Sequence, residues 1–393
     1  MLYSIFALAF LLAALAQLGY AGLFLLARTR HKAGREEADT PVSVVICARN
    51  EAGNLQQFLP EVLQQDYPPH LWEVIVVDDG STDRSAGVLQ RLAVQYPGLR
   101  VIPLPPDTVK DLPGKKYALQ QGIAAARFDR VLLTDADCRP ASTQWLRTMS
   151  ASGRGIILGY GAYEQRPGLL NRFIRWETAH TCMQYASYAA IGLPYMGVGR
   201  NLSYPKNLLA GLEEDAAFRE AYTRTPSGDD DLLISRIARK DNVSVCLEKE
   251  AHTISIPQTS WKAWWRQKTR HSSTGKYYPV LIKGLLGIYG LSHGLYWLCG
   301  ITILIAAFFA APGAPASVWR LDGCLAVPNH LTLLLLALFG LRLLLYWGCA
   351  ARWYRALRVK KLLLFYPLGD LGWALYNVFL SPYILWKNRK AWK

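Results

Sequence analysis

The stretch VIVVDDGSTD, residues 74–83, decides how the soluble part of this chain folds. Four consecutive β-branched residues predict a buried strand, and Asp78 and Asp79 follow at its end, just before a Gly-Ser turn. Taken alone, the two aspartates are explained most simply as an Asx turn that closes the strand. The stretch therefore predicts a strand that ends in carboxylates.

Similar apolar runs recur between residues 41 and 258, and segments with helical spacing of apolar residues separate them. The runs are PVSVVICA (41–48), EVIVVDD (73–79), RVIPL (100–104), RVLLTDAD (130–137) and GIILGYG (155–161). Strands that are apolar on both faces and alternate with helices form mostly parallel sheets. We therefore expect one α/β domain over 41–258, with ligands at the carboxyl ends of its strands.

Apolar segments long enough to cross a bilayer lie on both sides of this domain. Residues 2–27 carry no charge, and further spans are expected near 285–311 and 330–350. The stretch 362–386 is also long enough, but it contains Asp370 and two prolines. It is either a further span, which we favour, or a re-entrant hairpin.

The formal net charge of +15 could suggest nucleic-acid binding, but the basic residues cluster beside the apolar segments. These residues are Arg28, Arg30, Lys32, Arg35, Arg352, Arg355, Arg358, Lys360, Lys361, Lys387, Arg389, Lys390 and Lys393. Such clusters indicate the cytoplasmic side of a membrane. We expect an integral protein of a bacterial inner membrane, with a cytoplasmic domain and no nucleic-acid partner.

The expected order is a membrane helix (1–27), a basic linker (28–40), the α/β domain (41–258), an interfacial helix (259–279), a membrane region (280–386) and a basic tail (387–393). Seven cysteines occur singly, without a C-x-x-C pair, so neither a zinc site nor a disulfide framework is expected.

Two further acidic groups accompany Asp78 and Asp79. Asp135 and Asp137 end another predicted strand, where two carboxylates two residues apart can bind a divalent cation that neutralises a diphosphate. His252 is a possible additional ligand, although a histidine with ordinary surface contacts is the simpler interpretation.

Asp229, Asp230 and Asp231 open a predicted helix. One aspartate would cap that helix, whereas three crowd like charges, and such crowding raises a carboxylate's pKa and makes it a better base.

The segment SWKAWWRQKTRH (260–271) predicts an amphipathic helix at the membrane interface. Trp261, Trp264 and Trp265 share one face of that helix, while Gln267 and Arg270 point away from its centre. Taken alone, the segment would be explained equally well by a helix on the membrane surface that has no chemical role.

Six segments in order resemble the motifs of membrane-bound family-two glycosyltransferases with a GT-A fold, over essentially the whole chain. They are ICARNE (46–51), VVDDGSTD (76–83), GKKYAL (114–119), TDAD (134–137), GDDDLL (228–233) and QKTRH (267–271). The last segment departs from the family's Q-x-x-R-W pattern because His271 replaces the tryptophan. His271 is most simply an interfacial residue; a second base is the alternative.

The resemblance implies a role for each matched residue. The residues expected to contact the nucleotide and donor are Ala48, Glu51, Asp78, Asp79, Lys115 and Asp135. Asp137 and Asp135 are expected to bind Mg²⁺ or Mn²⁺, and Asp230 is expected to act as the general base. Gln267 and Arg270 are expected to clamp the diphosphate and the acceptor.

The expected activity is transfer of a sugar from a UDP-sugar to a hydroxyl of a membrane lipid or lipid-linked acceptor. One alternative is a processive polysaccharide synthase of the chitin or poly-N-acetylglucosamine type, and another is a non-catalytic membrane sensor of sugar nucleotides. Residues 172–193 are expected to form an interfacial helix along an acceptor groove. The sequence leaves the transferred sugar and the oligomeric state open.

Overall fold

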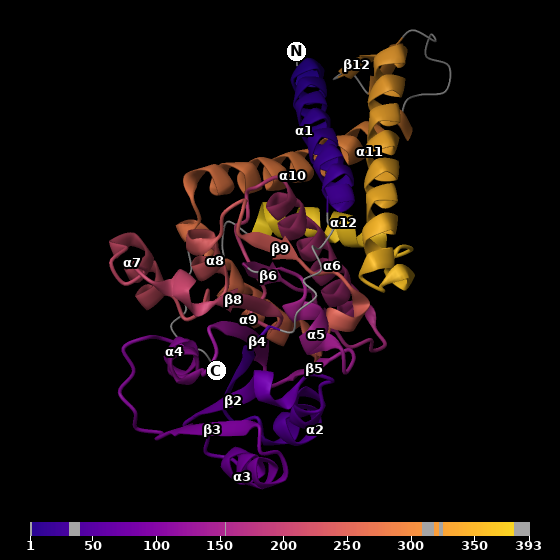
Figure 1. The fold of residues 1–393 in the computed structure, drawn as a ribbon. Coiled ribbons are helices and arrows are strands. Elements are labelled where there is room, and N and C mark those ends of the chain that lie inside the picture. The colour runs from indigo at the N-terminus through magenta and orange to yellow at the C-terminus, as the bar shows by residue number, and fades with distance from the viewer. Residues whose placement is uncertain (1, 31–39, 154, 309–317, 322–324, 381–393) are drawn as a thin grey trace.

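The computed structural model describes residues 2–30, 40–153, 155–308, 318–321 and 325–380. Long helices lie together at one end of the molecule, and the helices α2 and α3 lie at the opposite end (Figure 1). The central sheet lies between these two groups.

The central sheet has seven strands in the order β3-β2-β1-β4-β8-β6-β9. Their bounds are Val42–Ala48 (β1), Trp72–Asp79 (β2), Leu99–Leu104 (β3), Arg130–Asp135 (β4), Ile156–Leu158 (β6), Leu202–Pro205 (β8) and Val243–Val245 (β9). Strands β3, β2, β1 and β4 are parallel, whereas β8 runs antiparallel to β4 and β6. The predicted mostly parallel α/β sheet is therefore confirmed.

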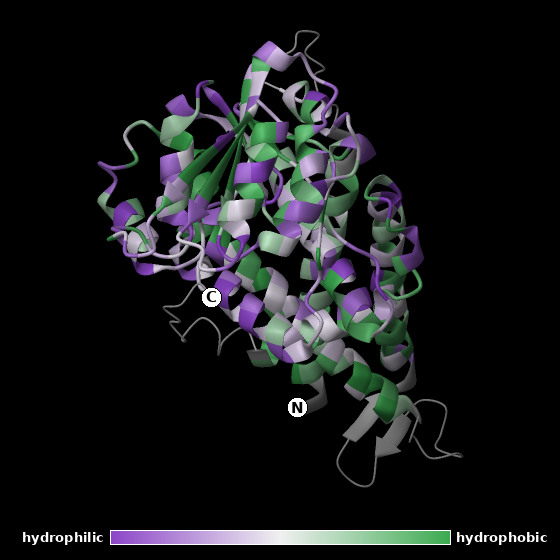
Figure 2. Cartoon of the chain, turned by 90° about the horizontal axis from the view of Figure 1, so that it is seen from below, coloured by the Kyte–Doolittle hydropathy of each residue, from purple (hydrophilic) through white to green (hydrophobic). Residues whose placement is uncertain are grey.

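Core clusters cover both faces of the sheet. Successive side chains of a strand point to opposite faces, so a strand can contribute to both clusters. Val44 and Ile46 of β1 pack into one core cluster, and Val45 packs into the other. Figure 2 shows the strands as largely hydrophobic within a more mixed surround. The helices of this domain are α2 (Ala52–Leu63), α3 (Ser85–Gln95), α4 (Lys116–Ala125), α5 (Trp145–Ser150), α6 (Leu169–Ala190), α7 (Ala216–Arg224) and α8 (Asp231–Ile237).

Short elements complete the chain. A second sheet consists of β5 (Cys138–Pro140), β10 (Thr253–Ser255) and β7 (Gly161–Tyr163). A separate two-stranded sheet consists of β11 (Val318–Leu321) and β12 (Leu325–Pro328). The single-turn helices are η1 (Pro69–Leu71), η2 (Lys206–Leu209), η3 (Lys249–Ala251), η4 (Gly275–Tyr277) and η5 (Lys360–Leu362).

Three helices, α1 (Leu2–Arg30), α10 (Val280–Phe308) and α11 (Asn329–Ala356), are long and apolar enough to cross a membrane over Ile5–Ala27, Val280–Ala307 and His330–Ala356. They coincide with the three spans expected from the sequence.

The segment 362–386 lies partly outside the described residues. Its described part begins at the last residue of η5 and then forms α12 (Tyr366–Leu375), which continues as a π-helical turn η6 (Tyr376–Leu380). In Figure 1, α12 lies across the direction of α1 and α11. The choice between a span and a hairpin stays a prediction.

The predicted amphipathic helix is α9 (Trp261–Ser272), and its tryptophan face packs partly against protein. Trp264 is only 5% exposed, and its ring lies 5.5 Å from Phe173 of α6. Its indole Nε1 also donates a hydrogen bond to Glu177 Oε2 at 3.4 Å. Trp264 therefore lies in the interior rather than at the head groups, because α6 supplies the aromatic and polar partners; Trp261 is 50% exposed.

A buried polar network joins the helices of the membrane region. Arg342 of α11 forms a salt bridge with Asp370 of α12, and both side chains are fully buried. Arg342 Nη2 also donates to Gln17 Oε1 of α1 at 2.7 Å, and Trp297 Nε1 of α10 donates to Asp370 Oδ2 at 2.9 Å. Charges within an apolar region need such partners, so the pair fixes α12 against the long helices.

We expect Asp370→Asn to lower the free energy of unfolding by about 3 to 5 kcal/mol, because Arg342 then remains buried without its counter-charge. Thermal unfolding of the purified protein in detergent measures the loss. The double variant Asp370→Leu with Arg342→Met removes both charges and should recover most of it. An unchanged unfolding temperature in Asp370→Asn would show that the pair does not hold α12.

Candidate active site

The acidic motifs lie side by side at the carboxyl edge of the central sheet. In the strand register, Asp78 of β2 lies opposite Ala48 of β1, and Asp135 of β4 lies opposite Cys47 of β1. Parallel strands end at the same edge, so the register alone brings these positions together.

In the first acidic pair, one oxygen of each carboxylate has a partner in its own surroundings, whereas the buried Asp79 Oδ2 has no hydrogen-bond partner among the described residues. Asp79 Oδ1 lies 2.5 Å from Lys110 Nζ, and Asp78 Oδ1 accepts a hydrogen bond from the backbone N–H of Ser81 at 3.1 Å. Asp78 therefore closes the turn, as the simpler explanation of this motif expects. The nucleotide contacts assigned to Ala48, Asp78 and Asp79 stay predictions.

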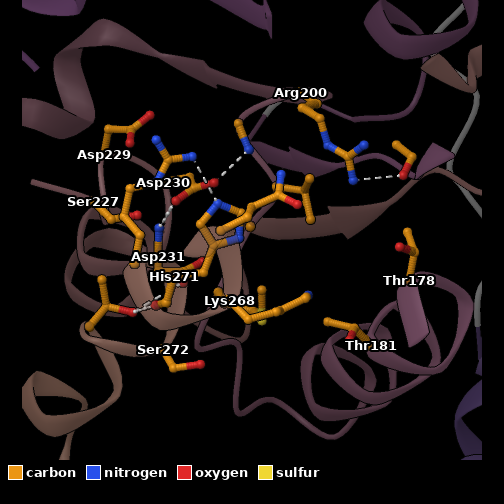
Figure 3. Close-up of a pocket in the computed structure, with 18 of the residues that line it drawn as sticks. Thr178, Thr181, Arg200, Ser227, Asp229, Asp230, Asp231, Lys268, His271 and Ser272 are labelled. Atoms are coloured by element: carbon orange, nitrogen blue, oxygen red, sulfur yellow. Dashed lines mark hydrogen bonds between the residues drawn. The ribbon is translucent and has the colours of Figure 1, made fainter. Parts of the chain in front are cut away.

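A cavity of about 1310 Å³ opens at this sheet edge and extends to the membrane helices. Its lining includes most of the predicted site residues: Glu51, Lys115, Asp135, Asp137, Asp229, Asp230, Asp231, Gln267, Arg270 and His271. Figure 3 shows the Asp229–Asp231 triplet on one side, Arg200 across from it, and Thr178 and Thr181 on the α6 side. Motifs separated by up to 220 residues thus face one space.

Lys115 connects two of the acidic motifs. Its ammonium lies 2.9 Å from Asp135 Oδ1 and 2.8 Å from Asp229 Oδ2. Burial alone would lower the pKa of Lys115, but Asp135 and Asp229 hold that pKa well above its ordinary value. Lys115 is therefore a permanent cation between the D-x-D pair and the aspartate triplet.

The D-x-D carboxylates differ in charge state. Burial and the neighbouring Asp135 raise the pKa of Asp137 to about 6. Burial also acts to raise the pKa of Asp135, but Lys115 outweighs it and the net shift is downward. One carboxylate is thus firmly ionised, and the other takes up a proton below about pH 6.

Asp135, Asp137 and Cys138 offer ligand atoms within 4.8 Å of one another. The Cys138 thiol contacts Ser255 Oγ at 2.8 Å, and burial raises its pKa well above the ordinary value, so it stays protonated. The remaining carboxylate oxygens are the donors that Mg²⁺ and Mn²⁺ prefer, and the set fits such an ion.

His252 is not a member of this ligand group, and its Nε2 lies 3.2 Å from the backbone carbonyl oxygen of Leu247. Its role as an additional ligand stays a prediction. The structure adds no support to it.

Within the triplet, Asp230 has the environment of a base. Its Oδ2 accepts from the Gly199 N–H at 2.7 Å, and its Oδ1 accepts from the Asp231 N–H at 2.8 Å, which also caps α8. Burial, together with Asp229, raises its pKa to about 6. Asp231 accepts a hydrogen bond from Tyr278 Oη at 3.0 Å, and burial raises the pKa of Asp231 well above its ordinary value.

Helix α9 lies along the same cavity with both predicted clamp residues. Gln267 Nε2 donates to Tyr163 Oη at 3.3 Å, and Arg270 Nη2 lies 3.4 Å from His271 Nε2. Burial and Arg270 hold the pKa of His271 well below its ordinary value, so the imidazole is neutral. A neutral ring suits a polar wall of the cavity.

Arg200 is a site residue that the sequence analysis missed. Its guanidinium lies 4.2 Å from the ring centre of Tyr163 and donates to Ser255 Oγ at 2.9 Å. Arg200 also acts to lower the pKa values of Asp135 and Asp137. A single arginine in the run MGVGRNLS gave no indication of this position.

The comparisons with known proteins agree with this geometry. The family described as "Glycosyl transferase family 2" matches residues 43–153. A probable glycosyltransferase, YdaM of Bacillus subtilis, is 28% identical over 269 residues, covering 64% of this chain and 59% of that protein. A β-monoglucosyldiacylglycerol synthase of Nostoc sp. is 28% identical over 148 residues, 37% of this chain and 30% of that protein.

Among solved structures, a mannosyltransferase of Pyrobaculum calidifontis in complex with GDP-Man and Mn²⁺ has a TM-score of 0.54 at 18% identity, covering 93% of this chain and 98% of that one. The chain spans less than two thirds of the length of the two curated relatives.

The sheet topology and the carboxylates at its edge define a GT-A-like fold. Residues 43–153 form a family-two glycosyltransferase domain.

We expect Lys115→Met to raise the pKa of Asp230 by about one to three units, because an opposite charge that favours the carboxylate is lost. The acid limb of a pH–activity profile should therefore move to higher pH, in addition to a loss of activity. The matched control is Lys262→Met, at an exposed position of α9. An acid limb that stays in place would separate Lys115 from Asp230.

Proposed function

We propose that this chain transfers a sugar from a nucleoside diphosphate sugar, with UDP as the expected nucleotide, to a hydroxyl of a membrane lipid or lipid-linked acceptor. The observation that carries the proposal is the single cavity that lies between the D-x-D motif and the membrane helices. Its lining runs from Asp135 and Asp137 to Leu286 and Gly287 of α10 and to Trp373 of α12.

The reaction we infer is one in-line displacement with inversion at the anomeric carbon. The acceptor oxygen forms the new bond to that carbon as the bond to the diphosphate oxygen breaks, and the diphosphate leaves with the electron pair. Asp230 takes the acceptor proton. Its pKa of about 6 leaves it ionised at neutral pH yet basic enough to accept that proton.

The departing diphosphate requires positive charge. Asp135 and Asp137 would hold a Mg²⁺ or Mn²⁺ ion, which supplies charge stabilisation for the leaving group. Arg270 lines the same cavity and would contribute a fixed cation from the α9 side.

A lipid acceptor is favoured by the position of α6. Glu177, Thr178, Thr181 and Gln184 follow helical spacing and line the cavity between the acidic motifs and the membrane region. Such a polar row can hold a lipid head group while its chains stay among the long helices. The same feature supports the expected acceptor groove along residues 172–193.

A processive polysaccharide synthase is the second candidate, because the family resemblance covers such enzymes. Two features disfavour it: His271 replaces the tryptophan that would stack on an acceptor sugar, and only three described helices are long enough to line a polymer channel. The cytoplasmic position of the α/β domain and the bacterial inner membrane remain part of the proposal, and the former rests on the basic clusters.

We expect Asp230→Asn to reduce sugar transfer by at least about a hundredfold while donor affinity changes little, because the amide cannot accept the proton. Transfer of labelled sugar measures the first quantity, and donor-dependent thermal stabilisation measures the second. Asp241→Asn, at an exposed turn, is the matched control. Full transfer by Asp230→Asn would remove Asp230 from the role of base.

Membranes that contain the protein, incubated with labelled UDP-sugars and Mn²⁺, should yield a product that organic solvent extracts. Chelation of the metal should abolish it, because the leaving group loses its counter-charge. A labelled product that stays polymeric would support the synthase instead. Donor binding without transfer, under all metals and lipids tried, would support a sensor.

A further inference from the structure

A second cavity lies away from the candidate active site, where α11 ends and the chain turns toward α12. It has a volume of about 730 Å³ and is lined by Lys249, Glu250, Arg352, Arg355, Ala356, Arg358 and Lys360. Lys249 and Glu250 come from η3 of the α/β domain, and the remaining residues come from the end of α11 and the turn after it. We call this cavity the basic groove.

The basic groove carries a strong excess of positive charge. Five of its lining side chains are basic, and Glu250 is its one acidic residue. Glu250 lies 3.3 Å from Lys249, whereas Arg352, Arg355, Arg358 and Lys360 form no salt bridge within the described part of the chain. These four side chains are exposed, so the groove lacks internal neutralisation for most of its charge.

Topology and helix polarity account for part of this charge. Basic residues are common at the cytoplasmic end of a span, and cations are favourable near a helix C-terminus. Neither effect explains why the basic residues line a hollow. Neither explains why Lys249, about a hundred residues earlier in the chain, joins them. The convergence of two segments on one hollow therefore points to a ligand.

The backbone at Arg358 gives a second indication. Helix α11 ends in a Schellman-type turn, in which the Val359 N–H donates to the Tyr354 carbonyl at 2.9 Å. Arg358 has φ = 58° there, a left-handed conformation usually taken by glycine. An arginine at this strained position places its charge in the groove at a conformational cost.

Apolar side chains are exposed directly after the groove. Leu364 is 86% exposed and Leu368 is 55% exposed, on the segment that leads from η5 into α12. Exposed leucines of this kind suit contact with lipid rather than water. The groove and the leucines together match a molecule with an anionic head and apolar chains.

We propose that the basic groove binds the phosphate-bearing head group of an anionic membrane phospholipid, whose acyl chains lie against Leu364 and Leu368. Charge complementarity selects the head group, and the exposed leucines distinguish a lipid from a soluble anion. The bound lipid would tie the α/β domain to the end of α11, since Lys249 and Arg355 come from these two parts.

The test uses the full-length protein in lipid nanodiscs, with native mass spectrometry to count bound phosphatidylglycerol against phosphatidylcholine. The groove variant combines Arg352→Gln, Arg355→Gln, Lys360→Gln and Arg358→Gly, the last of which keeps the left-handed turn. We expect its affinity for phosphatidylglycerol to fall at least about tenfold, because four basic side chains that attract the anionic head group are lost. A control that also removes four exposed positive charges, but elsewhere in the α/β domain (Arg91→Gln, Arg219→Gln, Arg224→Gln and Lys240→Gln), should bind as the unmodified protein does.

A third variant, Leu364→Gln with Leu368→Gln, should weaken binding of the long-chain lipid but not of glycerophosphoglycerol. Equal binding of the two lipids by the unmodified protein would overturn the proposal, as would undiminished binding by the groove variant. Competition by inorganic phosphate at the same concentration as the lipid would overturn it in favour of a soluble anion. The lipid comparison and the single variant Lys360→Gln keep the test decisive if the fourfold variant does not fold.

Discussion

The candidate active site depends on one cation, Lys115, which lies partly buried between two groups of carboxylates. Asp135 and Asp229 belong to segments far apart in the chain, and each contacts the Lys115 ammonium. Without a cation between them, the D-x-D pair and the aspartate triplet would repel one another in a partly desolvated space. Gly199 allows Asp230 to lie close to the backbone beside this group, because an added Cβ would lie 3.2 Å from Asp230 Oδ2.

The sequence could predict those site residues whose positions follow from the ends of the strands. Four β-branched residues before Asp78 and a similar run before Asp135 define strand ends, and parallel pairing then brings those ends together. The pairing of Asp79 with Lys110 could not be found this way. It depends on the loop after β3, which brings Lys110 back to the sheet edge 31 residues along the chain from Asp79, and loop paths have no periodicity.

Arg200 and Trp264 show a second limit of the sequence. Arg200 reaches the cavity because β8 enters the sheet antiparallel to β4, which a short run with few apolar residues does not indicate. Trp264 belongs to an amphipathic pattern that is equally typical of a membrane surface and of a helix–helix interface. The partner surface on α6 decides between them, and the sequence of α9 alone does not contain that surface.

The long helices and the cavity of the candidate active site form one structural unit. Helix α12 is held at Asp370 by the buried arginine of α11, and the turn after it contacts α9 through Tyr376 Oη and Ser272 Oγ at 2.9 Å. Trp373 lies between these two attachments and Tyr376 forms the second one, and both residues line the cavity. This part of the cavity wall is thus positioned by an ion pair among the long helices. The α/β domain by itself would supply the D-x-D pair and the candidate base, but not the part of the cavity wall that α9, α10 and α12 contribute.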